Sequence, residues 1–298
     1  MRAVFLMSIA AVVATMTVSS TSNADPPFAI PQRCTGKQLC WAPSFNRMDI
    51  PEMVLTGAAA SIALAANIVH PLNTGWSGGI FFDDAIRSAL RLHSVDAQLE
   101  VRSGTDLGLA VMTSYPFLVD SLIVAYWYRG SADVALQMAL IDAEAFAITG
   151  AIEGISNFVA GRARPYAQEC GGGIPSNTTD CSGDTLNRSF FSGHSAVSFT
   201  AAALICAHHE ALHLFDSAAA DHAACIAGFT AATAIGVMRI VGDAHYFSDV
   251  FIGALVGTTV GLTIPLLHHY NRAGSSKSSP IGFSVVPGFG TATVVGTF

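Results

Sequence analysis

The sequence predicts an all-α fold: a bundle of about six core helices, followed by a short C-terminal tail that could form a β-hairpin. Two observations predict this fold. Apolar residues make up 51% of the 298 residues and charged residues only 12%, and the apolar residues gather in long runs rich in alanine, leucine and valine. Breaks rich in glycine and proline separate these runs, as they commonly separate helices. Because alanine and leucine are strong helix formers, such runs favour helices over strands.

Four segments follow one another along the chain. Residues 1–24 are interpreted as a signal peptide, and residues 25–50 as an irregular segment that contains prolines and cysteines. Residues 51–270 form the helical domain, and residues 271–298 form a tail in which glycine, serine and proline are frequent. Core helices are expected near residues 52–70, 105–128, 132–160, 194–215, 222–238 and 246–269, with shorter helices near 83–100.

The first 24 residues, MRAVFLMSIAAVVATMTVSSTSNA, have the three parts of a secretory signal peptide. Arg2 supplies the positive start, an apolar stretch follows, and Ser-Asn-Ala at residues 22–24 is a small-residue cleavage site. The sequence therefore predicts export to the periplasm or cell envelope, with an uncleaved anchor as the alternative. The 14 basic and 21 acidic residues give a net charge of −7, which argues against a nucleic-acid partner.

The cysteines are consistent with an oxidising compartment. Two pairs are close in sequence and lie outside the helical runs: Cys34 with Cys40, and Cys170 with Cys181. In an exported chain we expect both pairs to form local disulfides. Cys206 and Cys225 lie inside apolar runs and are expected to be buried thiols.

Membrane insertion is harder to predict from this sequence. A spanning helix needs about 20 apolar residues, and residues 250–267 are the best candidate. The other runs are short or carry acidic residues, which are costly in lipid unless they are functional. These acids are Asp120, Asp142, Glu144 and Glu153. We therefore expect a helical domain in the periplasm that can contact the membrane surface.

Three short segments carry residue types suited to binding an anion. They are NFVAGRARP at residues 157–165, FSGH at residues 191–194 and MRIVGDAHYFSD at residues 238–249. Ser192 and Gly193 stand at an expected helix start, where backbone N–H groups favour an anion and glycine allows close approach. Arg164 and Arg239 are suited to bidentate contacts with phosphate oxygens.

Two histidines in these segments can supply the chemistry. His245 and Asp249 are four residues apart, so on a helix the carboxylate can hold one imidazole nitrogen and leave the other free to attack. His194 can then protonate the leaving oxygen. An anion cradle, an oriented nucleophile and an acid together indicate phosphoryl transfer.

These three segments resemble the signature of the phosphatidic acid phosphatase type 2 superfamily, K-x6-R-P, P-S-G-H and S-R-x5-H-x3-D. That superfamily includes bacterial class A acid phosphatases, lipid phosphatases and vanadium haloperoxidases. Eight of the eleven specified positions match, in order and at the required internal spacings, and the resemblance covers about residues 50–270. The matching positions are Arg164, Pro165, Ser192, Gly193, His194, Arg239, His245 and Asp249.

The resemblance implies a helical fold and a role for each matching side chain. His245 would attack phosphorus, Asp249 would orient it, and His194 would protonate the leaving alcohol and then activate water. The phosphate oxygens would be held by Arg164, Arg239, Ser192, Gly193 and, more weakly, Asn157. No metal and no cofactor is implied.

Three positions depart from the family pattern. Asn157 stands where the family has lysine, Phe191 where it has proline, and Met238 where it has serine. The loss of lysine removes one cation from the anion cradle, which would cost on the order of 2 kcal/mol of transition-state binding. Asn157 can still donate a hydrogen bond, and Arg162 is a nearby source of charge.

The sequence therefore predicts a phosphatase that hydrolyses phosphomonoesters or lipid phosphates through a phosphohistidine, with a phosphorylated small molecule or lipid as its partner. Two alternatives stay open. One is a catalytically weakened or non-catalytic envelope protein that binds an anion or lipid head group. The other is a vanadium-dependent haloperoxidase, because vanadate mimics phosphate in the same cradle.

A second motif suggests a different kind of site. His209, Glu210 and His213 fit H-E-x-x-H, the helical zinc-protease motif. No third ligand follows at the expected spacing, and the segment is equally typical of a polar helix C-terminus. We expect no metal there, and the other histidines are expected to cap or solvate helices.

Overall fold

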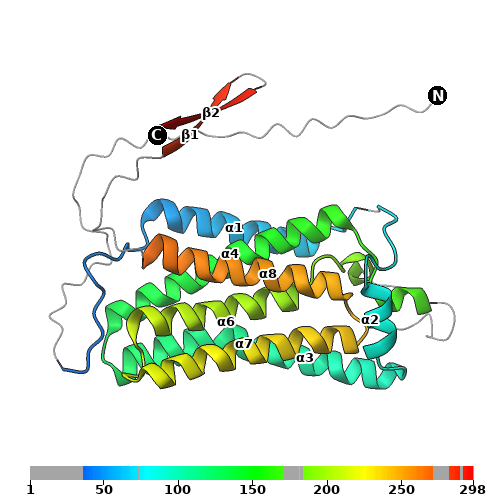
Figure 1. Ribbon diagram of the computed structural model, residues 1–298, viewed down its shortest axis with the longest axis horizontal. Coiled ribbons are helices and arrows are strands. Elements are labelled where there is room, and N and C mark those ends of the chain that lie inside the picture. The colour runs from blue at the N-terminus through cyan, green and yellow to red at the C-terminus, as the bar shows by residue number, and fades with distance from the viewer. Residues whose placement is uncertain are drawn as a thin grey trace.

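Long helices run side by side along most of the chain and form an elongated bundle (Figure 1). The computed structural model describes residues 36–72, 74–170, 181 and 184–270, together with the backbone of residues 282–288 and 291–297. The expected signal peptide, residues 1–24, lies outside the described residues. The helical elements are α1 (Ile50–Ile68), α2 (Asp83–Leu90), α3 (Val95–Tyr115), η1 (Pro116–Tyr128), α4 (Ala132–Ala160), η2 (Pro165–Glu169), η3 (Asp184–Asn187), α6 (Gly193–Leu212), α7 (Ala218–Val241), α8 (Phe247–Thr263) and η4 (Ile264–His269).

The all-α prediction is confirmed. The clearest difference concerns α3, which starts at Val95 and continues through η1 to Tyr128 without leaving helical geometry. Its first turns carry Asp96, Glu100 and Arg102, so the apolar run that predicted this helix covers only its second part. In the tail, the strands β1 (Gly282–Gly288) and β2 (Thr291–Thr297) pair antiparallel, with Gly282 opposite Thr297.

The central helix of the bundle is α6, most of whose side chains are buried. It packs closely on α8 because Gly253, Gly257 and Gly261 form a stripe of small residues along the facing side of α8. A Cβ added at Gly253 would lie 2.6 Å from the Ser192 carbonyl oxygen, and one at Gly257 would collide with the Ala196 backbone. This close approach brings the start of α6 next to the start of α8.

In contrast to α6, helix α1 contributes no buried residue and lies on the outside of α4. Small residues again set the contact. A Cβ added at Gly150 would lie 3.1 Å from Ala63, and one at Gly154 would lie 2.5 Å from Ala66. Asp49 and Glu52 form a capping box that starts α1.

The disulfides partly agree with expectation. Cys170 and Cys181 are bonded, as predicted. Cys206 and Cys225 are also bonded, so the prediction of buried thiols was wrong. The reason is the short connection between α6 and α7, which lays these helices against each other and leaves the two Cα atoms 4.4 Å apart. Cys40 is disulfide-bonded as well, and its expected partner Cys34 lies outside the described residues.

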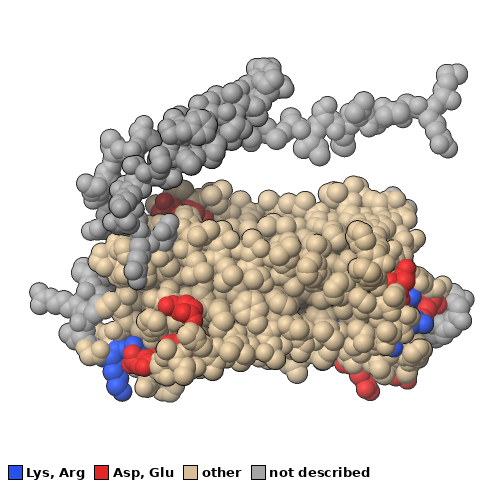
Figure 2. Space-filling view, in the orientation of Figure 1, with Lys and Arg blue, Asp and Glu red and all other residues tan. Residues whose placement is uncertain are grey.

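Among the described residues, five helices are long and apolar enough to cross a membrane: 50–68, 95–128, 132–169, 218–241 and 247–269. The sequence had favoured one candidate, residues 250–267. The acids that argued against the segments 95–128 and 132–169 mostly face inward. Asp120 and Asp142 are fully buried and Glu144 is 5% exposed. Figure 2 shows the result: on this face, charged side chains gather at the two ends of the bundle and the middle is free of them.

Candidate active site

The three motif segments meet at one end of the bundle, where α4 and α7 end and α6 and α8 begin. The glycine that ends α4, Gly161, has a φ of +51° and turns the chain toward Arg164. The Ser192 amide donates to the Asp249 carbonyl oxygen at 3.1 Å, which ties the second segment to the third. The Asn157 side chain donates to the Phe191 carbonyl oxygen at 3.1 Å, which ties the first segment to the second.

His245 is 3% exposed and lies in the short turn between α7 and α8. Its Nδ1 atom is 2.9 Å from the Ser189 carbonyl oxygen. Because a carbonyl can only accept a hydrogen bond, Nδ1 carries the proton and Nε2 is left with its lone pair. Burial, helped by the positive charges of Arg164 and Arg239, lowers the pKa of His245 well below its usual value. The ring is therefore neutral and able to act as a nucleophile at neutral pH.

Asp249 is fully buried, and its carboxylate lies 3.8 Å from Nδ1 of His245. That distance is too long for the direct hydrogen bond that the sequence predicted. Its oxygens instead accept from Arg162 at 2.6 Å, from the Ser189 hydroxyl at 2.6 Å and from the Tyr246 amide at 2.9 Å. Asp249 thus fixes Ser189, whose carbonyl holds His245, and its negative charge remains close to the ring.

Arg239 is buried and Arg164 half-buried, and both lie near the two histidines, whose pKa values their charges lower. The Nε groups of both arginines are buried without a hydrogen-bond acceptor among the described residues. Arg239 places one terminal nitrogen 2.9 Å from the Thr105 hydroxyl. Buried N–H donors are normally paired, so these two orphaned groups indicate a place for an anion.

His194 is the second residue of α6, and its Nε2 atom lies 2.7 Å from a carboxylate oxygen of Asp106 on α3. The same carboxylate lies 3.6 Å from Arg239. Burial, and then the charge of Arg239, lowers the pKa of His194 to about 4, while Asp106 acts in the opposite direction. An anion bound between the arginines would offset their charge and raise that pKa.

Ser192 and Gly193 form the start of α6. The Ser192 hydroxyl is buried and serves as the helix N-cap, accepting from the Ser195 amide at 3.3 Å. Gly193 is packed against Glu153, because a Cβ added there would lie 2.8 Å from a Glu153 carboxylate oxygen. A glycine is required at this close approach.

Asn157 is buried, but its donors are directed to protein acceptors. Its amide nitrogen donates to Glu153 Oε1 at 2.6 Å and to the Phe191 carbonyl oxygen. Arg162, the suggested substitute cation, is fully buried and paired with Asp83 at 2.8 Å and with Asp249. The charge of Arg162 is therefore already balanced by two carboxylates and Asn157 carries no charge, so neither side chain replaces the missing lysine of the family pattern.

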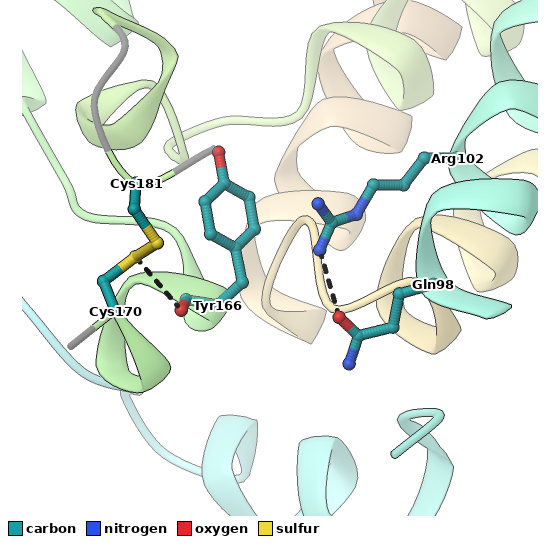
Figure 3. Close-up of a disulfide and its surroundings, with 5 residues drawn as sticks. All are labelled: Gln98, Arg102, Tyr166, Cys170 and Cys181. Atoms are coloured by element: carbon teal, nitrogen blue, oxygen red, sulfur yellow. Dashed lines mark hydrogen bonds between the residues drawn. A yellow bond between two sulfur atoms is a disulfide. The ribbon is translucent and has the colours of Figure 1, made fainter. Parts of the chain in front are cut away.

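Helix α3 contributes to the site side chains that none of the three sequence motifs predicted. Arg102, Thr105 and Asp106 come from this helix, outside all three motifs, and the first and last share a face one turn apart. The signal that could have found them is a row of polar residues on one face of an otherwise apolar helix. Figure 3 shows Arg102 against the Tyr166 ring, 4.4 Å from its centroid, with the Cys170–Cys181 disulfide on the other side of Tyr166.

The H-E-x-x-H residues do not converge on one point. His209 is buried between Asp221, at 2.7 Å, and Asp120, at 3.4 Å. His213 follows the end of α6 in a left-handed conformation and is 69% exposed. Glu210 lies 3.2 Å from His222 instead.

The bundle and this site define a class of protein: an all-helical domain in which arginines and histidines gather where the helices begin and end. Residues 139–273 match the family model described as the PAP2 superfamily. The predicted resemblance to this superfamily is thereby confirmed over these residues.

A curated relative supports the same assignment. The chain is 27% identical over 146 residues to the lipid A 1-phosphatase of Porphyromonas gingivalis. The match covers 49% of this chain and 27% of the relative's length, so the two proteins share only part of their sequence. No solved structure matches the chain.

Proposed function

We propose that this protein is a membrane-embedded phosphatase that removes the phosphate from a lipid phosphomonoester through a phosphohistidine at His245. The observation that carries the proposal is the pair of arginines, Arg164 and Arg239, whose buried Nε groups lack acceptors among the described residues and lie beside two histidines. The PAP2 family match and the lipid phosphatase relative support the same reaction class.

In the first step, Nε2 of His245 attacks phosphorus, a P–N bond forms and the bond to the lipid oxygen breaks. The imidazole becomes positively charged, and the nearby Asp249 carboxylate stabilises that charge. The Ser189 carbonyl holds the Nδ1 proton throughout, so the ring keeps its orientation. Asp249 and Ser189 therefore act as positioning residues.

His194 gives its proton to the leaving lipid oxygen and afterwards takes a proton from the water that attacks the phosphohistidine. This second step regenerates neutral His245 and releases inorganic phosphate. Arg164, Arg239 and the Gly193 amide stabilise the negative charge on the equatorial oxygens. Asn157 has its donors engaged and would act by fixing the 190–191 backbone.

A groove on α3 and η1 favours a lipid substrate over a soluble one. It has a volume of about 580 Å³ and starts at Asp106, which contacts His194. From there it continues over Leu109, Ala110 and Phe117 to Leu118. Twelve residues of helix correspond to about 18 Å. An acyl chain lying in this groove would place its phosphate at the catalytic histidines.

The test is phosphate release from phosphatidic acid in mixed micelles by the full-length protein in detergent. His245→Ala is expected to lower kcat by about a thousandfold or more, because the nucleophile is lost. His93→Ala, an exposed histidine between α2 and α3, is the matched control and should keep wild-type activity. Acid-labile labelling from a ³²P-labelled substrate should appear in wild type and be absent from His245→Ala.

Three outcomes would contradict the proposal. Equal activity in wild type and His245→Ala would exclude the phosphohistidine. Binding of the lipid without any hydrolysis would favour the non-catalytic envelope protein. Peroxide-dependent halide oxidation after addition of vanadate, without phosphate release, would favour the haloperoxidase.

A further inference from the structure

A second cluster of ionisable side chains lies at the end of the bundle opposite the candidate active site. Glu144 of α4 and His268 and His269 of η4 each offer one potential ligand atom, and these three atoms all lie within 4.8 Å of one another. Figure 1 shows why they meet: α8 begins near α2 and ends at the other end of the bundle, where α1 begins. Glu52, in the first turn of α1, adds a carboxylate oxygen 3.0 Å from Nε2 of His268.

The buried half of this cluster has the geometry of an oriented metal ligand. His269 is fully buried, and its Nε2 atom lies 3.0 Å from Glu144 Oε2. Its other nitrogen, Nδ1, lies 3.4 Å from the Asn46 carbonyl oxygen, which can only accept. A histidine that donates through one nitrogen to a backbone carbonyl presents the other to a metal, as is usual in metal sites.

The charges in the cluster favour a bound cation. With Nδ1 of His269 donating to Asn46, a neutral ring would turn the Nε2 lone pair toward the Glu144 carboxylate, which is 5% exposed. A second imidazole and a second carboxylate, those of His268 and Glu52, lie beside this pair and are 3.0 Å from each other. One divalent cation would neutralise both carboxylates and accept both imidazoles.

We propose that Glu144, His268 and His269 bind a divalent transition-metal ion, with Glu52 as the fourth ligand. Two imidazoles and two carboxylates form a ligand set suited to zinc. The ion would join three elements that are far apart in sequence: α1, α4 and η4. Since α1 has no buried residue of its own, the metal would fasten its first turn to the bundle.

The test uses full-length protein purified without a histidine tag, in detergent, and stripped of metal with a chelator. Isothermal titration with zinc chloride should give one bound zinc per chain for wild type. His268→Ala, at a half-exposed ligand, should weaken zinc binding about tenfold or more while leaving the fold intact. His222→Ala is the matched control, because His222 also pairs with a glutamate, 3.2 Å away, but belongs to no cluster of three such ligands among the described residues.

Thermal unfolding provides a second readout. Zinc should raise the melting temperature of wild type and His222→Ala, because it binds only the folded chain, and should have little effect on His268→Ala. Glu144→Gln should behave like His268→Ala. Equal zinc affinity in wild type and His268→Ala would overturn the proposal, as would loss of the zinc in His213→Ala instead, since that result would place the ion at the H-E-x-x-H segment.

Discussion

At the scale of single residues, the two histidines of the candidate site need opposite protonation states. His245 must be neutral to attack, and its lowered pKa keeps it neutral from mildly acidic pH upward. His194 must be protonated to act as an acid, yet its pKa is lowered to about 4 by burial and by Arg239. The site therefore depends on bound phosphate to raise the pKa of His194.

This dependence gives a prediction about pH. The rate constant kcat/KM reports free enzyme and kcat reports the complex, so the alkaline fall in kcat/KM should occur at lower pH than the fall in kcat. In Asp106→Asn the fall in kcat/KM should move to still lower pH, because the carboxylate that raises the pKa of His194 is gone. Full pH profiles of kcat and kcat/KM for wild type and Asp106→Asn measure both shifts. A fall at higher pH in Asp106→Asn would contradict the assignment of His194 as the acid.

The position of Asn157 provides a second prediction at this scale. A lysine there would restore the family cation, but the Glu153 carboxylate, 2.6 Å from the Asn157 amide nitrogen, would pair with it. Asn157→Lys alone should therefore raise kcat/KM only slightly, and Asn157→Lys combined with Glu153→Gln should raise it about tenfold, worth about 1.4 kcal/mol. Glu210→Gln, a substitution on the exposed end of α6, is the control. A double variant that folds but shows no gain would mean that the cradle does not need this charge.

At the scale of elements, the groove on α3 and η1 predicts chain-length selectivity. Ala110 is exposed in this groove, so Ala110→Trp would fill it and should lower kcat/KM for a long-chain lipid phosphate about tenfold. Hydrolysis of a water-soluble phosphomonoester should stay within about twofold, because the histidines are untouched. Ala139→Trp is the matched control, since Ala139 of α4 lines a second groove, along η1 and α4, that does not include Asp106. Equal loss on both substrates would show that the groove does not hold the acyl chain.

Element by element, the sequence predicts what depends on local pattern and misses what depends on packing. The helix positions follow from apolar runs, and Arg164, His194, Arg239 and His245 meet because each stands at a helix end. The contribution of Asp106 could not be predicted, because it depends on α3 packing beside α6. The Ser189 carbonyl that orients His245 is a backbone group, which no residue pattern records.

At the scale of the whole molecule, the bundle has an apolar surface because acidic side chains face its interior. In the sequence, these same acids argued against membrane-spanning helices. His208 lies 2.9 Å from Asp142, and His209 lies 2.7 Å from Asp221. These pairs bury their charges in the interior, where ionisable groups within membrane bundles are normally found. Outside them, side chains such as Leu55, at 68% exposed, and Leu255, at 56%, face outward.

So large an exposed apolar surface is rare in soluble monomers, and it predicts membrane insertion. The expressed chain should stay in the membrane pellet after alkaline carbonate washing and should need detergent for extraction. Leu255→Arg places a charge in the middle of α8 and should cost about 2.5–3.5 kcal/mol of insertion free energy, lowering the amount of folded protein in the membrane. Leu90→Arg is the control, because α2 lies at the charged end of the bundle (Figures 1 and 2). A monodisperse chain in the soluble fraction without detergent would contradict the prediction.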